Sequence, residues 1–155
     1  MSRTPLASDE EIALFRTLLN DWVAPSLESG LLESYDGDSG RWLLRFHGEE
    51  RQIIAVWLTL RQRTVYVESE LMPAPEENAE EIFRFLLTKN AELYPVHAAI
   101  GPENGIYLVT RFPIADATEE LLDEIVGATL TFVDTLFPTV MTLGFPGMYR
   151  RRRRG

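Results

Sequence analysis

A proline-rich junction at residues 71–90 (LMPAPEENAEEIFRFLLTKN) constrains the fold more than any other stretch of the chain. Pro73 and Pro75 lack backbone N–H donors, so the extended pattern that precedes them has to stop there. Pro75 suits the first position of a helix, and the glutamates that follow it favour the positive end of a helix dipole. The junction therefore predicts a strand that ends before Pro73 and a helix that begins at Pro75.

The predicted helix is amphipathic. Its charged residues alternate with a group of apolar residues that share one side: Ile82, Phe83, Phe85, Leu86 and Leu87. Such a stripe is typical of a helix that packs on a sheet.

Three strands are predicted before the junction. Residues 41–47 and 64–71 alternate between apolar and polar, the pattern of a half-buried strand. Residues 52–60 are apolar on both faces, as in a central strand that is covered on both sides. The gaps between these segments are too short for anything except hairpins, so the three strands form an antiparallel meander.

Two further strands are predicted after the junction, at residues 96–100 and 106–114. The segment between them contains Asn104-Gly105, a dipeptide that favours a β-hairpin.

Two more helices complete the predicted order. Ser8 and Glu11 have the spacing of a capping box, which starts a helix of about four turns that ends at Pro25. Residues 26–38 contain glycines and fit a loop with at most a short strand or one helical turn.

The last helix is capped by Asp116 or Thr118 and has to end by Phe137, before Pro138. It has two apolar stripes, which need more cover than one sheet face supplies. Either the first helix or a second copy of the chain could provide that cover.

These elements predict an α+β fold of order α-β-β-β-α-β-β-α, with helices packed on a twisted antiparallel sheet. Apolar residues make up 45% and charged residues 25% of the 155, which suits one globular domain, assigned to residues 1–149. We find no run of about 18 apolar residues that would span a membrane. The N-terminus is acidic where a signal peptide would be apolar, so we expect a cytoplasmic protein.

The charge is distributed unevenly. The net charge is −9, yet five arginines lie in the last six residues: Arg150, Arg151, Arg152, Arg153 and Arg154. Without them the chain has 10 basic and 24 acidic residues, a charge of −14. We expect residues 150–155 to be a disordered tail. The tail could contact nucleic acid or an anionic membrane, although an acidic body repels both.

Catalytic and metal-binding patterns are absent from the sequence. There is no cysteine, and His47 and His97 have no partner at metal-ligand spacing, so we interpret both as structural or surface residues. Paired glutamates such as Glu49-Glu50 and Glu80-Glu81 could act as acid and base, but they lie where carboxylates cap or solvate. No serine motif and no phosphate-binding loop is present. We therefore expect no catalytic residue, no cofactor and no metal.

Aromatic residues could form a binding surface. Trp42, Trp57 and Tyr66, together with Tyr94 and Tyr107, could line an apolar groove beside an acidic rim. The same residues fit an ordinary core equally well.

Several stretches resemble the bacterial YbjN family, in particular its actinobacterial branch. They include RWLLRF at residues 41–46, VWLTL at residues 56–60 and, most specifically, MPAPEEN at residues 72–78. The resemblance extends over about residues 10–149, and the arginine tail departs from it. It implies a fold like that of the type III secretion chaperones, small acidic homodimers that hold an unfolded stretch of a client. It also implies a non-enzymatic, sensory or regulatory role.

The leading hypothesis is a non-enzymatic homodimer that binds an unidentified protein through an apolar surface. Leu122, Val126 and Val133 of the last helix are the expected dimer interface. The alternative is a nucleic-acid-associated or membrane-associated regulator that acts through the arginine tail. A weaker third hypothesis is a hydrolase with paired carboxylates.

Overall fold

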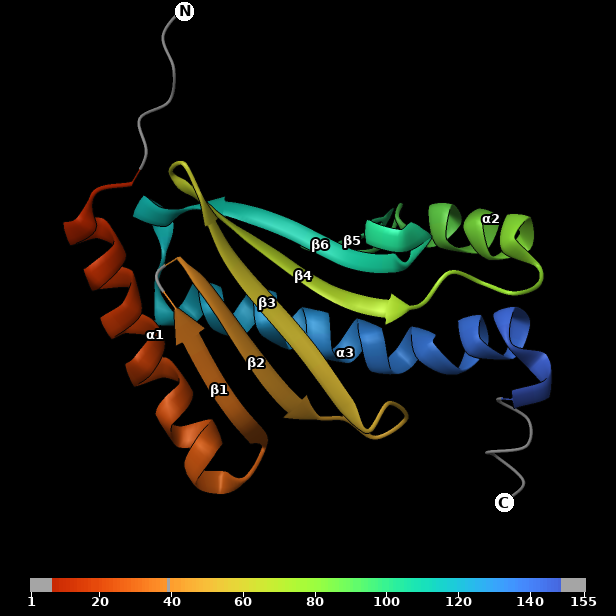
Figure 1. The fold of residues 1–155 in the computed structure, drawn as a ribbon, viewed down its shortest axis with the longest axis horizontal. Coiled ribbons are helices and arrows are strands. Elements are labelled where there is room, and N and C mark those ends of the chain that lie inside the picture. Colours follow the sequence, from red (N-terminus) through yellow and green to blue (C-terminus); the bar gives the residue numbers. More distant parts are fainter. Residues whose placement is uncertain (1–6, 39, 149–155) are drawn as a thin grey trace, which may run out of the picture.

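The fold is a six-stranded antiparallel sheet with three α-helices packed on one of its faces (Figure 1). The computed structural model describes residues 7–38 and 40–148. The strands follow the order β1-β2-β3-β4-β6-β5 across the sheet. The elements are α1 (Asp9–Ser29), β1 (Leu32–Asp38), β2 (Arg41–His47), β3 (Ile53–Arg61), β4 (Thr64–Met72), α2 (Ala79–Lys89), β5 (His97–Ile100), β6 (Ile106–Pro113) and α3 (Glu119–Gly144), with short 3₁₀ turns at Pro102–Asn104 and Ile114–Asp116. This arrangement confirms the predicted α+β class.

The first helix begins as predicted and ends later than predicted. The Ser8 hydroxyl accepts from the Glu11 N–H at 3.1 Å, and Glu11 Oε1 accepts from the Ser8 N–H at 3.2 Å. The prediction that Pro25 ends the helix is wrong, because α1 continues to Ser29. Pro25 is exposed, so the carbonyl that it leaves unpaired faces solvent. The helix ends at Gly30, whose φ of 83° supplies the left-handed C-terminal turn.

Strand β1 occupies part of the segment whose structure the sequence left open. It pairs with β2 and places Gly37 opposite Trp42. A Cβ at Gly37 would overlap the Trp42 indole, so glycine is required for the ring to lie flat beneath the strand.

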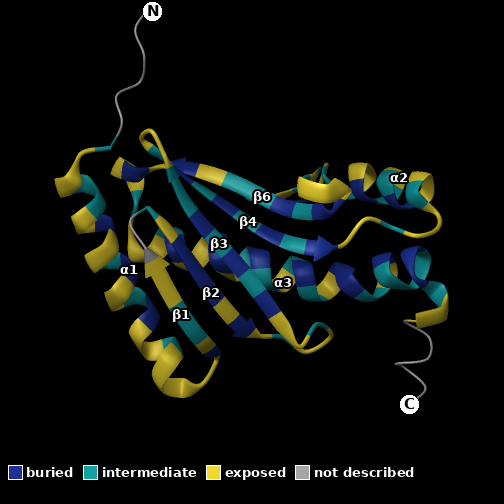
Figure 2. Ribbon diagram, in the orientation of Figure 1, coloured by how far each residue is buried: buried dark blue, intermediate teal, exposed yellow. Residues whose placement is uncertain are grey.

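The sheet has one covered face and one open face. Along β3, the buried Ile54, Val56 and Leu58 point toward the helices, and the alternate residues are only half-buried or exposed (Figure 2). In Figure 1, α3 passes behind β2, β3 and β4, and no helix lies in front of them. β3 is therefore interior to the sheet, but the prediction that both of its faces are covered is wrong. Its apolar residues on the second face form part of a surface.

The proline junction connects β4 to the C-terminal end of α3. The prediction that Pro75 occupies the first helical position is wrong, because α2 begins at Ala79 after Asn78. The N–H groups of Glu76 and Glu77 both donate to the Gly144 carbonyl at 3.1 Å. The Asn78 Nδ2 donates to the Leu143 carbonyl at 2.8 Å. The junction thus satisfies carbonyls at the end of α3 that have no partner within the helix.

Helix α3 extends past the proline that was predicted to stop it. Its N-cap is Thr118, whose hydroxyl accepts from the Leu121 N–H at 3.1 Å. The expected end at Phe137 is wrong, since Pro138 lies inside a helix that continues to Gly144. Phe137 and Val140, on either side of the proline, are buried, and this packing holds the turn that lacks one hydrogen bond.

By length and composition, α3 could cross a membrane, although we expected no membrane-spanning segment from the sequence. Of the most apolar 18-residue window in α3, 44% of the residues are buried inside the domain. Core helices of globular domains have the same composition, and α3 packs as such a helix here.

Asp134, in the middle of α3, fixes the loop between β2 and β3. Its carboxylate accepts from the N–H groups of Glu49, Glu50 and Arg51 at 3.0, 2.8 and 3.0 Å. Partial burial raises the pKa of Asp134, but the three backbone hydrogen bonds together outweigh burial and lower the pKa below its usual range.

This contact predicts a pH dependence of stability. A carboxyl whose pKa is lower in the folded state contributes stability that is full above its unfolded pKa of about 3.9 and is lost as the pH falls through the folded pKa. We therefore expect urea unfolding titrations to show a fall in stability below about pH 4. The Asp134→Asn variant should be less stable at pH 7 and should show a shallower fall. The pKa of Glu11 is also lowered, by the Ser8 backbone N–H and by Arg63, so Glu11 should add to the fall in the same direction. An unchanged acid limb in Asp134→Asn would contradict the assignment.

Candidate protein-binding surfaces

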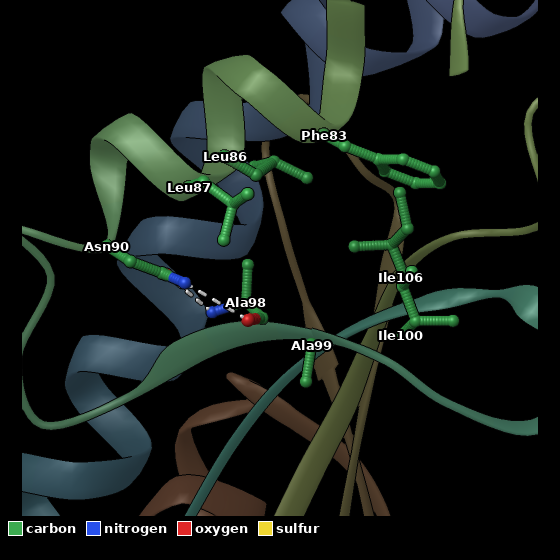
Figure 3. A pocket seen from close by; sticks show the side chains of 8 residues that line it. All are labelled: Phe83, Leu86, Leu87, Asn90, Ala98, Ala99, Ile100 and Ile106. Atoms are coloured by element: carbon green, nitrogen blue, oxygen red, sulfur yellow. Dashed lines mark hydrogen bonds between the residues drawn. The ribbon is translucent and has the colours of Figure 1, made fainter. Parts of the chain in front are cut away.

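An apolar groove of about 340 Å³ lies between α2 and β5. Phe83, Leu86 and Leu87 form its helix side, and Ala98 and Ile100 form its strand side (Figure 3). Leu87 is 71% exposed and Ile100 is 59% exposed, whereas most of the large apolar side chains of this fold are buried. Large apolar side chains exposed together mark a surface that another molecule covers.

The polar residue of the groove, Asn90 at the end of α2, is hydrogen-bonded to β5. Asn90 Oδ1 accepts from the Ala98 N–H at 2.8 Å, and Asn90 Nδ2 donates to the Ala98 carbonyl at 3.2 Å. These two Ala98 groups face away from β6, along the outer edge of the sheet. Asn90 therefore blocks strand addition at the middle of β5. The groove is suited to side chains from a partner rather than to an added strand.

The second surface is the open face of the sheet. Strand pairing places Arg41, Thr59, Tyr66 and Arg111 in one row across β2, β3, β4 and β6. A parallel row consists of open-face residues from the same strands and from β5: Leu43, Trp57, Glu68, Val109 and His97. No α-helix covers these rows in the part of the chain that the structure describes.

Arginines stack on the aromatic residues of this face. The Arg41 guanidinium lies 4.0 Å from the ring centroid of Trp57, and the Arg61 guanidinium lies 4.4 Å from that of Tyr66. Both contacts are within the range of cation–π attraction. The stacking holds both guanidinium groups over the aromatic rings of this face.

The structure divides the predicted interface residues between the core and the surface. Leu122, Val126 and Val133 are at most 1% exposed, because they pack against the sheet of their own chain and leave no side-chain surface for a partner. Trp42 is likewise buried, with its ring edge-on to Phe15 at 5.1 Å. The remaining two residues of the predicted interface, Trp57 and Tyr66, are half-buried on the open face. Both arginines and carboxylates, among them Arg41 and Glu68, lie beside them on this face.

The other candidate residues are dispersed. His47 and His97 are exposed on different strands, and the described residues contain no group of three or more metal-ligating side chains. The backbone of the Glu49-Glu50 pair, rather than its carboxylates, contacts Asp134. Arg150, Arg151, Arg152, Arg153 and Arg154 lie outside the described residues, so their contact with nucleic acid or membrane stays a prediction.

Sequence reasoning missed two features of these surfaces. The exposure of Leu87 was hidden because it continues the apolar side of α2, and only the short β5 leaves it uncovered. The arginine–aromatic stacks were hidden because their members are 16 and five residues apart and meet only through strand pairing. The available signal was the alternation in β2, which places Arg41, Leu43 and Arg45 on one face of the strand.

Comparisons with known proteins identify relatives of uncharacterised activity. Residues 20–141 match the model of the YbjN family, described as "Putative bacterial sensory transduction regulator". An uncharacterized protein of Mycobacterium leprae is 32% identical over 105 residues, which are 68% of this chain and 57% of that protein. An uncharacterized protein of Mycobacterium bovis is 30% identical over 70% of this chain and 60% of that protein. The matched part is thus less than two thirds of each relative.

Similar folds occur in solved complexes of two proteins. A chain of the HopA1–SchA chaperone–effector complex matches with a TM-score of 0.59 at 15% identity, over 84% of this chain and 98% of its own length. A chain of the ExsC–ExsE complex matches with a TM-score of 0.57 at 17% identity, over 80% and 94%. A chain of the heterodimeric ExoU–SpcU complex of the Pseudomonas aeruginosa type III secretion system matches with a TM-score of 0.56 at 16% identity, over 79% and 97%. These likenesses confirm the predicted secretion-chaperone-like fold and show the fold alone.

Proposed function

Since the chain belongs to the YbjN family, in which the matched relatives carry no assigned activity, we propose that it is a non-enzymatic protein-interaction module of the cytoplasm. The module forms a homodimer and binds a segment of another protein. The observation that carries this proposal is the exposed apolar groove between α2 and β5. The structural neighbours come from complexes of two proteins, which supports the proposal by analogy of fold.

The second copy of the chain is the proposed occupant of the groove. Leu87 and Ile100 lie on opposite walls of the groove. If two copies face each other across a two-fold axis that runs along the groove, Leu87 of each copy lies against the Ile100 wall of the other. Because Asn90 closes the middle of the β5 edge, the contact involves α2 side chains and not a continuous sheet.

The charge around the groove also favours a second copy. The body of the protein is acidic, but the exposed side of α2 carries both signs, with Arg84 3.9 Å from Glu80 and Lys89 3.8 Å from Glu92. A balanced surface does not repel its own copy, whereas a uniformly acidic one would.

We expect the Leu87→Glu variant to be monomeric and folded. Leu87 is 71% exposed, so a carboxylate there is solvated in the monomer and the free energy of unfolding should change by less than about 0.5 kcal/mol. In the dimer the same carboxylate would be buried without a partner, which should weaken association by at least about tenfold. Light scattering with size-exclusion chromatography, over a concentration series, measures the change.

Leu14→Glu is the matched control. Leu14 is 65% exposed on α1 and lies outside the groove, so this variant adds the same charge and should remain dimeric. A wild-type protein that is monomeric at high micromolar concentration would refute the dimer, and equal effects of the two variants would refute the groove as its interface.

A further inference from the structure

The open face of the sheet carries arginines that have no ion pair among the described side chains. The structure describes nine lysine and arginine residues, and four of these form ion pairs with carboxylates. Four of the other five lie on the open face: Arg41, Arg45, Arg61 and Arg111. All four are exposed, and none has an ion pair to a carboxylate among the described side chains. The same face carries Asp36, Glu68 and Glu70, so a partner has to place negatively charged groups at the arginines and neutral groups at these carboxylates.

Apolar surface lies between these arginines. Trp57 and Val109, both half-buried, lie in one row with the buried Leu43 and with Glu68, next to the row that joins Arg41, Tyr66 and Arg111. Adjacent strands are about 4.8 Å apart, so Arg41 and Arg111, three strands apart, are separated by about 14 Å. A ligand that contacts both has to run along their own row, over Thr59 and Tyr66, with the row of Trp57 beside it.

From this pattern we infer that the open face binds an acidic amphipathic peptide segment of a partner protein. The carboxylates of the segment pair with Arg41, Arg61 and Arg111, and its apolar side chains pack on Trp57 and Tyr66. The inference rests on the proposed function as a protein-interaction module and names the surface and the chemistry of its partner.

Carboxylates suit the arginine geometry of this face. A guanidinium presents a planar fork of N–H donors that matches a carboxylate, and stacking on an aromatic ring leaves the edge of that fork free. Arg45 makes one weak contact, from Nη1 to Ser34 Oγ at 3.4 Å, so it is also available.

A nucleic acid fits the same face less well. A single strand carries a phosphate at every nucleotide. Its phosphates would be repelled by Glu68, in the row of Trp57, and by Glu70 in the next row. A peptide can place two or three carboxylates beside the arginines and neutral residues beside the glutamates. A peptide of about ten residues reaches about 33 Å when extended, enough to cross six strands.

The test uses a fluorescein-labelled peptide in which glutamates alternate with leucine and tyrosine. Its binding to the full-length wild type is compared with its binding to the Arg41→Glu/Arg61→Glu double variant. We expect fluorescence anisotropy to show binding to the wild type and a loss of affinity of at least about tenfold in the double variant. Quenching or a blue shift of tryptophan emission that disappears in Trp57→Phe would place the peptide on the open face.

Controls separate this inference from general electrostatics and from the dimer. The Ala13→Glu/Arg16→Glu/Ala24→Glu variant has the same net charge, changes only exposed residues of α1, away from the groove, and should bind the peptide as the wild type does. Equal losses in this variant and in Arg41→Glu/Arg61→Glu, or no binding of the peptide at high micromolar concentration, would overturn the inference. Tighter, arginine-dependent binding of an oligothymidylate would also overturn it. Light scattering on the same samples reports the dimer independently, so failure of the groove proposal would be recognised separately.

Discussion

Replacing Val126 with glutamate is expected to unfold the protein. Val126 is 1% exposed and lies in the core between α3 and the sheet. Among the described residues, the buried polar side chains are Ser69 and Thr129, and their hydroxyls already donate to the Ala55 and Ile125 carbonyls at 2.7 Å. A carboxylate at Val126 would have no partner there, and its burial costs several kcal/mol, comparable to the 5–15 kcal/mol or so that stabilises a whole domain.

Circular dichroism and urea unfolding test this expectation, and Val126→Ala makes it quantitative. The alanine variant should fold with about 2 kcal/mol less stability, because it removes methyl groups from a packed core, and should still dimerise. A Val126→Glu protein that is folded with near wild-type stability would mean that this side of α3 is not core. If it were folded and monomeric, the last helix would regain the interface role that the sequence suggested.

The strands and helices were predictable where local chemistry determines them. The Ser8–Glu11 capping box and the alternating strands appear as expected, because caps and periodicity depend on residues close in sequence. The three proline predictions failed because contacts outside the local segment outweigh the preference of the proline. Pro25 and Pro138 each remove a single hydrogen bond, and solvent or core packing compensates for that loss. Pro75 lies in the linker before α2, and this linker is hydrogen-bonded to the end of α3.

The surfaces were predictable only in part, because exposure depends on which elements meet. The apolar stripe of α3 fits a dimer interface and a core equally well, and the six-stranded sheet makes it core. The sequence grouped Trp42, Trp57 and Tyr66 as candidates for either a groove or the core. Trp42 is adjacent to Leu43 in β2, so its side chain points to the opposite, covered face of the sheet, whereas Trp57 and Tyr66 are half-buried on the open face. No sequence signal shows that β5 is too short to cover Leu87.

Replacing Gly48 with alanine is expected to cost about 2–4 kcal/mol of stability, through overpacking and weakened charge-assisted hydrogen bonds. A Cβ at this position would overlap the carbonyl oxygen of Arg51 and would lie 2.8 Å from Ile54 Cδ1 and 3.2 Å from Asp134 Oδ1. The overlapping atom belongs to the backbone, so no side-chain rotation relieves the contact. Moving the Arg51 peptide would disturb the hydrogen bonds that Asp134 accepts from this loop.

Gly127→Ala is the matched control, since it is the same substitution but is expected to raise stability. Gly127 lies exposed inside α3, and a Cβ there meets no atom within 4 Å. Alanine should raise stability by about 0.5–1 kcal/mol, because it restricts the unfolded chain and favours the helix. Thermal unfolding should therefore place the two midpoints on opposite sides of the wild type, with Gly48→Ala lower by about 5–15 °C. Equal midpoints for the two variants would mean that the loop yields to the added methyl, and that Asp134 does not hold it rigidly against α3.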